Sequence, residues 1–163
     1  MHLHNPADPA RSAQRRLIKS VLEAHGALPS ATGRPAYTQT LPCAPESARR
    51  ARLLVSIACD TWGLADLAET GALVVSELVS NSVAHSGSRL VRVTVSLPEQ
   101  GRVRIAVVDK SRTCPVPRRA TDDDENGRGF AVIEALGDRW GTDLLRWGKS
   151  VWVELCAKSE DER

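Results

Sequence analysis

Two consecutive segments of alternating polarity constrain the fold of this chain more than any other feature. Valine alternates with polar residues from 90 to 97, and branched apolar residues alternate with arginine in the first part of 102 to 109. Because successive side chains of a strand point to opposite faces, each segment predicts a half-buried strand. The connection Pro98-Glu99-Gln100-Gly101 predicts a hairpin, so the two strands should pair antiparallel.

Two helices are predicted ahead of this hairpin. Apolar residues recur at helical spacing from 47 to about 62, and Gly63 ends that segment. The second helix is expected to begin at a cap supplied by Asp66 or Thr70 and to run to about His85. Both helices have one apolar face that a sheet can cover.

The remaining elements complete the predicted architecture. A strand at 37–41 precedes the helices, and a helix at 129–136 and a strand pair at 139–145 and 150–155 follow the hairpin. The order predicts an α+β two-layer sandwich, with helices on one face of a mixed, mainly antiparallel sheet. The segment from 110 to 128 has no periodicity, and a loop of this length in a compact domain is usually functional or disordered.

The length of 163 residues suggests one domain with a tail. We expect an N-terminal extension over 1–35, a domain over 36–157 and a polar tail over 158–163. Within the extension, 11–28 is suited to a helix and 29–35 to a linker. This helix is either part of a mobile extension or a docking or dimer helix, and its short apolar stripe favours the mobile extension.

Charge and hydropathy argue against several classes of function. The formal net charge of +2 favours neither a nucleic-acid nor an anionic-membrane partner. No apolar run is long enough to span a bilayer, and the first residues lack the basic and apolar regions of a signal peptide. We therefore expect a cytoplasmic protein that binds neither nucleic acid directly nor a membrane.

The four cysteines, Cys43, Cys59, Cys114 and Cys156, are widely spaced and form no CxxC pair. Zinc sites usually use close pairs of ligands, and the four histidines do not complete such a site. We expect free thiols in a reducing compartment.

One stripe of the second helix carries Glu77, Asn81 and His85. A helix turns by about 100° per residue, so side chains four residues apart align with a small drift. Taken alone, the stripe is most simply a solvent-facing one. As a site, it offers Mg²⁺ the neutral oxygen of Asn81, a base in Glu77 and a phosphate contact in His85.

Three further motifs carry weaker signals. Asp109 ends a strand, where it is either a solvated carboxylate or an acceptor for an exocyclic amine such as that of adenine. Gly127-Arg128-Gly129-Phe130 opens a helix, whose free N–H groups suit phosphate, although most such glycine pairs are turns. In the last hairpin, Lys149 is either an exposed cation or a phosphate ligand, and Ser150 is a hydrogen-bonding group facing the nucleotide side of the sheet.

In this order the motifs resemble the GHKL, or Bergerat-fold, ATP-binding domains. ELVSNSVAH resembles the N box of that family, VVDKS its first glycine box, GRGF its second and GKSVWVEL its last strand. The layout from about Ala36 to Leu155 includes LPCAPESARRARLLVSIACDTWGL before the N box and ALGDRWG after GRG. It is similar to small stand-alone ATP-binding proteins of actinobacteria, which are similar in turn to anti-sigma factor serine kinases.

The resemblance implies ATP and Mg²⁺ as cofactors and a role for each matching residue. Asn81 would bind the Mg²⁺ that bridges the phosphates, and Glu77 would be the catalytic base. Asp109 would receive the adenine amino group with Ser150 nearby, and residues 110–126 would form a lid over ATP. The other positions expected around the nucleotide are His85, Ser111, Gly127, Arg128, Gly129, Phe130 and Lys149.

The first glycine box departs from the family pattern DxGxG. Both of its glycines are replaced, one by Ser111 and one by Thr113. Because Thr113 does not easily reach the backbone conformations open to glycine, we expect the lid to fold differently from that of the family. This change affects the positioning of phosphate more than the binding of adenine.

The sequence leaves two main hypotheses for the function and a third, less favoured one. The first is an enzyme, a serine/threonine protein kinase that moves the γ-phosphoryl group of ATP to an anti-anti-sigma partner and controls transcription by partner switching. The second is a non-catalytic, nucleotide-gated module that sequesters a sigma factor or another regulatory partner. The third is a degenerate fold without nucleotide. A homodimer would match the anti-sigma kinases that the chain resembles.

Overall fold

The computed structural model describes residues 35–112 and 125–158, together with positions 13, 16, 20, 28 and 29. For 28, 29 and 125–129 the description covers the backbone alone. The helix predicted over 11–28 lies mostly outside these residues, as do Cys114, most of the predicted lid and most of the C-terminal tail.

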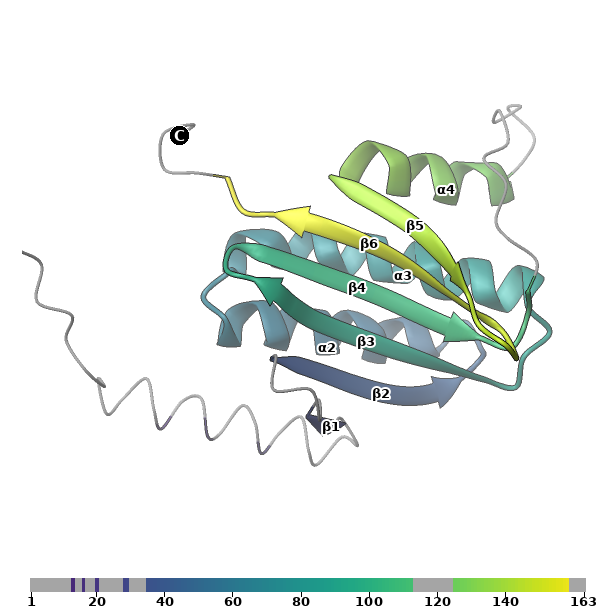
Figure 1. Cartoon of the computed structure of the whole chain (residues 1–163), viewed down its shortest axis with the longest axis horizontal. Coiled ribbons are helices and arrows are strands. Elements are labelled where there is room, and N and C mark those ends of the chain that lie inside the picture. Colours follow the sequence, from purple (N-terminus) through teal and green to yellow (C-terminus); the bar gives the residue numbers. More distant parts are fainter. Residues whose placement is uncertain are drawn as a thin grey trace, which may run out of the picture.

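The described strands form one six-stranded sheet in the order β1-β2-β3-β4-β6-β5, and every neighbouring pair is antiparallel. The helices cover one face of this sheet (Figure 1). The predicted α+β two-layer sandwich is therefore confirmed, although the described pairs include none of the parallel ones expected of a mixed sheet. The strands are β1 (Leu28–Pro29), β2 (Ala36–Pro42), β3 (Leu90–Glu99), β4 (Arg102–Asp109), β5 (Arg139–Leu144) and β6 (Lys149–Cys156); the helices are α2 (Ser47–Thr61), η1 (Ala65–Leu67), α3 (Ala68–His85) and α4 (Glu125–Leu136).

The predicted hairpin forms the centre of the sheet. In β3 and β4 the apolar residues of the alternation face the helices and are buried, whereas the residues between them lie on the open face. Gly101 closes the turn with a φ of 79°, a left-handed conformation that glycine adopts at low cost. The period of two in the sequence thus sets which side of the sheet becomes the core.

The core lies between this sheet and α2 and α3. Leu54, Val55 and Ala58 of α2 are buried, as are Val75 and Leu78 of α3. The prediction that Asp66 or Thr70 caps α3 is wrong, because the helix begins after Leu67 without a side-chain cap. The 3₁₀ turn η1 leads directly into α3, so the chain enters the helix through a tightened turn instead.

Two features lie at the edges of the sheet, and the first is a correction. Leu28 and Pro29 pair with Tyr37 and Thr38 of β2, so Leu28 belongs to a two-residue strand and not to a helix. At the other end of the sheet, α4 links β4 to β5 while β6 lies between those two strands. This split β-α-β arrangement leaves β5 as an edge strand.

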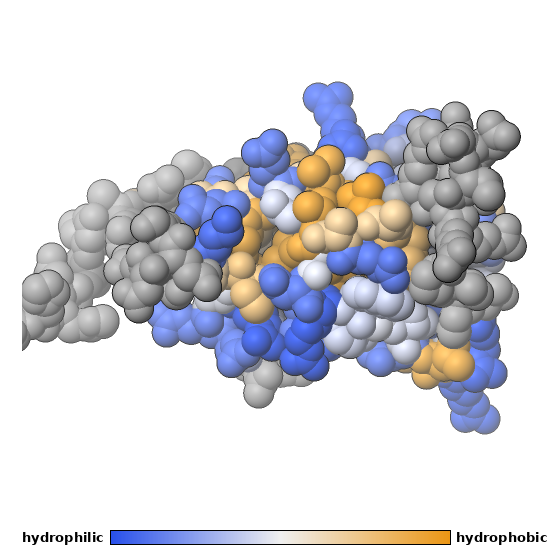
Figure 2. Space-filling model, turned by 90° about the horizontal axis from the view of Figure 1, so that it is seen from above, coloured by the Kyte–Doolittle hydropathy of each residue, from blue (hydrophilic) through white to orange (hydrophobic). Residues whose placement is uncertain are grey.

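Figure 2 looks at the molecule from above the view of Figure 1, from the side on which α4 and β5 lie. Hydrophobic residues gather across the middle of this side, and hydrophilic residues border them.

No helix in the described part of the chain is both long and apolar enough to cross a membrane.

The three described cysteines, Cys43, Cys59 and Cys156, are free thiols, as predicted for them. Burial within α2 raises the pKa of the Cys59 thiol to about 11, and the neighbouring carboxylate of Asp60 adds to this shift. Cys59 is therefore a neutral, apolar packing group at physiological pH.

Gly71 sits where α3 packs most closely on α2 and the sheet. A Cβ atom there would lie 2.7 Å from Cγ1 of Val55 and 3.3 Å from Cδ1 of Ile105. We expect Gly71→Ala to lower the free energy of unfolding by about 1 kcal/mol, because overpacking exceeds the gain in helix propensity. Urea unfolding measures this, with exposed Ser80→Ala of α3 as the control; a stabilised Gly71→Ala would contradict the packing.

Candidate functional site

The predicted polar stripe exists on α3. Glu77 and Asn81 are partly buried, and His85 is exposed as the last residue of the helix. The amide nitrogen Nδ2 of Asn81 is buried and has no hydrogen-bond partner among the described residues. A buried polar atom of this kind is rare in folded proteins and costs stability unless a ligand, ion or water satisfies it.

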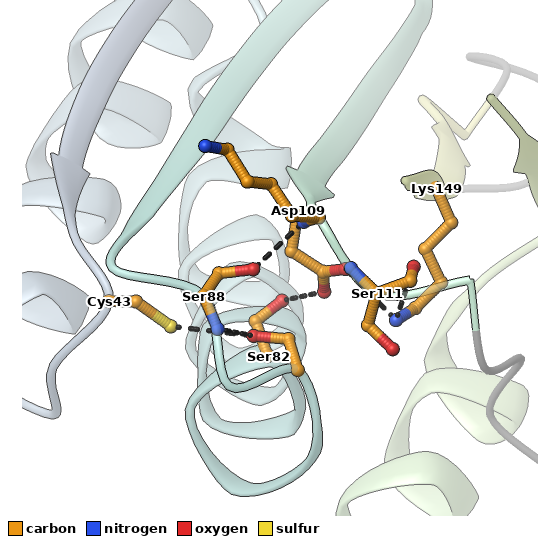
Figure 3. A network of polar contacts seen from close by, with 8 residues as sticks. Cys43, Ser82, Ser88, Asp109, Ser111 and Lys149 are labelled. Atoms are coloured by element: carbon orange, nitrogen blue, oxygen red, sulfur yellow. Dashed lines mark hydrogen bonds and ion pairs between the residues drawn. The ribbon is translucent and has the colours of Figure 1, made fainter. Parts of the chain in front are cut away.

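Asp109 is the centre of a buried polar network at the end of β4 (Figure 3). Its Oδ2 accepts a hydrogen bond of 2.8 Å from the hydroxyl of Ser82. Its Oδ1 accepts bonds of 3.0 Å from Nζ of Lys149 and from the backbone N–H of Ser111. The side chain is 1% exposed, so the interpretation of Asp109 as a solvated strand end is wrong.

Lys149 makes the ion pair with Asp109 at the first position of β6. Its side chain is 6% exposed, and Nζ also donates to the carbonyl oxygen of Ser111 at 3.3 Å. The interpretation of Lys149 as an exposed cation is therefore wrong. The antiparallel register places Lys149 directly opposite Asp109, so both side chains point to the helix side of the sheet.

The same register moves Ser150 away from the network. Ser150 lies opposite Val108, one residue out of phase with Lys149, and therefore belongs to the open face of the sheet. The expectation that Ser150 lies beside Asp109 is not met. Lys149 occupies that place, because it shares the parity of Val151 and Val153, whose side chains are buried under the helices.

Two further contacts fasten the loops at this end of the sheet. The backbone N–H of Lys110 donates to the hydroxyl of Ser88 at 2.8 Å. Gly148 packs so closely that a Cβ atom there would overlap the carbonyl oxygen of Asp109 and lie 3.0 Å from the Cα atom of Lys110. Glycine is thus required where the β5–β6 hairpin crosses the end of β4.

The glycine-containing segment near 127 lies inside α4. The helix begins at Glu125, so Gly127 and Arg128 lie within its first turns, whereas the predicted helix began at Gly129. The first N–H groups of a helix have no partner within the helix. Phe130 is 4% exposed and meets Trp140 edge-on at 4.8 Å, so its side chain anchors α4 to β5.

The side chains near Asn81 fit an Mg²⁺ ion that is held mainly by the phosphates of a bound nucleotide. Within the described ranges, no three His, Cys, Asp or Glu side chains come together as a metal site. Mg²⁺ accepts few protein ligands and keeps waters and phosphate oxygens, so the amide oxygen of Asn81 with a polyphosphate would be a sufficient donor set. Among the described residues Oδ2 of Asp109 accepts one hydrogen bond, so one acceptor position remains that suits an amino group.

Sequence reasoning missed Ser82 and Ser88. Ser82 follows Val75, Leu78 and Val79 on the sheet-facing stripe of α3, and a buried hydroxyl in an apolar stripe needs a partner. The position of Ser82 in the sequence could therefore have predicted a polar partner on the sheet that α3 packs against. Ser88 gave no comparable signal, since a serine in a turn commonly bonds locally.

A family model for the histidine kinase-like ATPase domain matches residues 41–153. This span contains α2, α3 and the whole network around Asp109. The chain belongs to the histidine kinase-like ATPase domain family. Membership in this family implies ATP binding.

A similar solved structure is the histidine kinase domain of the blue-light activated histidine kinase EL346 from Erythrobacter litoralis. It is 18% identical and aligns with a TM-score of 0.46 over 90% of this chain and 73% of that chain. No protein of curated function matches the chain.

The ion pair of Asp109 and Lys149 can be tested by a double-mutant cycle. Removing one partner leaves a buried charge uncompensated, so Asp109→Asn and Lys149→Met should each lower the free energy of unfolding by about 3–5 kcal/mol. The double variant should lose much less than the sum. Denaturant unfolding measures this, with Arg139→Gln, whose side chain is 62% exposed, as a control expected to change stability by less than about 1 kcal/mol. Additive losses would show that the pair is not coupled.

Proposed function

We propose that this protein is an ATP- and Mg²⁺-dependent regulator of the anti-sigma kinase kind, which phosphorylates a serine or threonine of an anti-anti-sigma partner. The observation that carries the proposal is the orphaned amide nitrogen of Asn81, next in sequence to Ser82, whose hydroxyl donates to Asp109. This nitrogen is a donor and suits a phosphate oxygen, whereas the amide oxygen of the same side chain is the atom that would hold Mg²⁺. Helix α3 thus links a position suited to Mg²⁺ and phosphate with a position suited to adenine.

The parts of the reaction divide along α3. Asp109, fixed by Ser82 and Lys149, keeps one acceptor position for the adenine amino group. Asn81 would hold the metal ion, and the free N–H groups at the start of α4 would face the phosphates. Glu77 lies one turn before Asn81, on the same flank, where it would orient the attacking hydroxyl and receive its proton.

Phosphoryl transfer depends on positioning and on charge neutralisation more than on covalent catalysis. Mg²⁺ supplies that neutralisation when it is bound. The chain's own residues position the groups and accept one proton. The family resemblance implies contacts with the phosphates for Gly127, Arg128 and His85. It also implies that residues 110–126 form the lid over ATP.

Nucleotide binding is the first step to test. Titration calorimetry with ATP, with and without Mg²⁺, should give an affinity that Mg²⁺ strengthens. Asn81→Ala should remove that strengthening, which we expect to be about tenfold or more, because the metal loses its protein ligand. Exposed Ser80→Ala, next to it on α3, is the matched control. An Asn81→Ala variant that binds Mg-ATP like the wild type would contradict the assignment.

Catalysis is tested separately from binding. Incubation with radiolabelled ATP and an anti-anti-sigma protein from the same genome should label a serine or threonine of that partner. Glu77→Gln should slow labelling by about a hundredfold or more while leaving ATP binding intact, because the proton acceptor is lost. Glu69→Gln, an exposed carboxylate in the first turn of α3, is the control.

The alternative is a nucleotide-gated binding module that sequesters its partner. The replacement of both glycines after Asp109 by Ser111 and Thr113 favours it, since these positions support the lid. Wild-type protein that binds Mg-ATP and its partner but transfers no label would decide for this alternative.

A further inference from the structure

Four chain connections meet at the end of the sheet that carries Asp109. The segment after β2 reaches the α3–β3 turn, where the N–H of Cys43 donates to the carbonyl oxygen of Arg89 at 2.8 Å. That turn holds the end of β4 through Ser88 and Lys110. The β5–β6 hairpin closes over β4 at Gly148. These contacts make one continuous surface, which we call the cationic end.

Large apolar side chains are exposed on the cationic end. Among the described residues five large hydrophobic side chains are strongly exposed, and three of them lie here. Leu90 begins β3 and is 54% exposed, whereas Leu144 ends β5 and Trp147 lies in the hairpin, each 53% exposed. Exposed apolar groups gathered in one place mark interaction surfaces, whereas scattered ones do not.

Positive charge surrounds these apolar groups. Among the described residues, two exposed carboxylates, Glu46 and Asp143, and five exposed cations lie at this end. None of these exposed cations forms an ion pair with a described carboxylate, unlike the buried Lys149 here and Arg102 and Arg104 at the other end of β4. The exposed cations of this surface are Arg89, Arg92 and Arg146, together with Lys110 and Arg112 at the start of the segment expected to form the lid.

Trp147 makes one contact that orients its ring in the free protein. The guanidinium of Arg92, on β3, lies 6.0 Å from the centre of the Trp147 ring. This cation–π contact joins β3 to the β5–β6 hairpin across β4 and β6. Tryptophan and arginine dominate the energetics of protein interfaces, and a side chain already ordered loses less entropy on binding.

We propose that the cationic end is a docking surface for a protein partner that presents carboxylates around an apolar side chain. Trp147, Leu90 and Leu144 would contact the apolar group, and the unpaired cations would meet the carboxylates. A single exposed aromatic ring does not make a base-stacking platform, and a chain charge of +2 gives little long-range attraction for a polyanion. These facts favour an acidic protein surface over nucleic acid or membrane. The proposal does not depend on nucleotide binding.

The probe is a short synthetic helix with leucine along one stripe and glutamate on both flanks, labelled for fluorescence anisotropy and titrated with the full chain. We expect salt-sensitive binding that Arg92→Gln with Arg146→Gln weakens by about tenfold, the loss of two exposed charge contacts. Trp147→Ala should weaken binding at least as much with no change in charge. The control with the same change in charge is Arg139→Gln with Lys158→Gln, at the opposite end of the sheet, which should bind like the wild type.

Other outcomes overturn the proposal. Absence of binding, or equal losses in the control pair and the cationic-end pair, would show that this surface is not a specific docking site. Tighter binding to phosphatidylserine vesicles or to an oligothymidylate than to the peptide would reassign the surface to a membrane or to nucleic acid. Thermal unfolding confirms that each variant is folded, and unchanged titrations with ATP keep this result separate from the nucleotide site.

Discussion

A carboxylate removed from water needs donors for its oxygens, and the end of the sheet is arranged around this requirement at Asp109. Its donors come from three places: Ser82 on α3, Lys149 at the start of β6 and the backbone after β4. An uncompensated buried charge costs several kcal/mol, so these elements are held in one register. The network therefore links the helix layer, the central strands and the loops that a nucleotide would contact.

Much of the architecture follows from patterns that extend over many residues. The alternation in β3 and β4 fixes which side chains enter the core, and the apolar spacing in α2 and α3 fixes which helix faces cover it. The details that sequence reasoning missed each depend on a single residue. Beginning β6 at Lys149 and not at Ser150 adds a residue on the buried face beside Asp109, and beginning α4 at Glu125 places the glycines inside the helix. Tertiary pairing sets such boundaries, and a single sequence does not encode them locally.

The residue types of the candidate site come from the sequence, whereas most of its contacts do not. Asp109 lies in a buried network and Asn81 has an amide nitrogen left without a described partner, and their roles toward a nucleotide stay predictions. The partner of Asp109 was not foreseen, because an ion pair between residues 40 positions apart leaves no local pattern. Phe130 shows the reverse case: it was predicted beside the nucleotide as part of the motif that begins at Gly127, and its side chain packs in the core against Trp140.

The position of β6 has a consequence for the order in which the molecule assembles. Among the described strands β6 is the last along the chain, yet it lies between β4 and β5 and not at an edge. During synthesis, β4 and α3 therefore leave the ribosome before the strand that completes their core exists. The nascent chain exposes one side of β4 until β6 has been made, so the whole sheet becomes stable only after that point, and chaperones have a defined interval in which to bind.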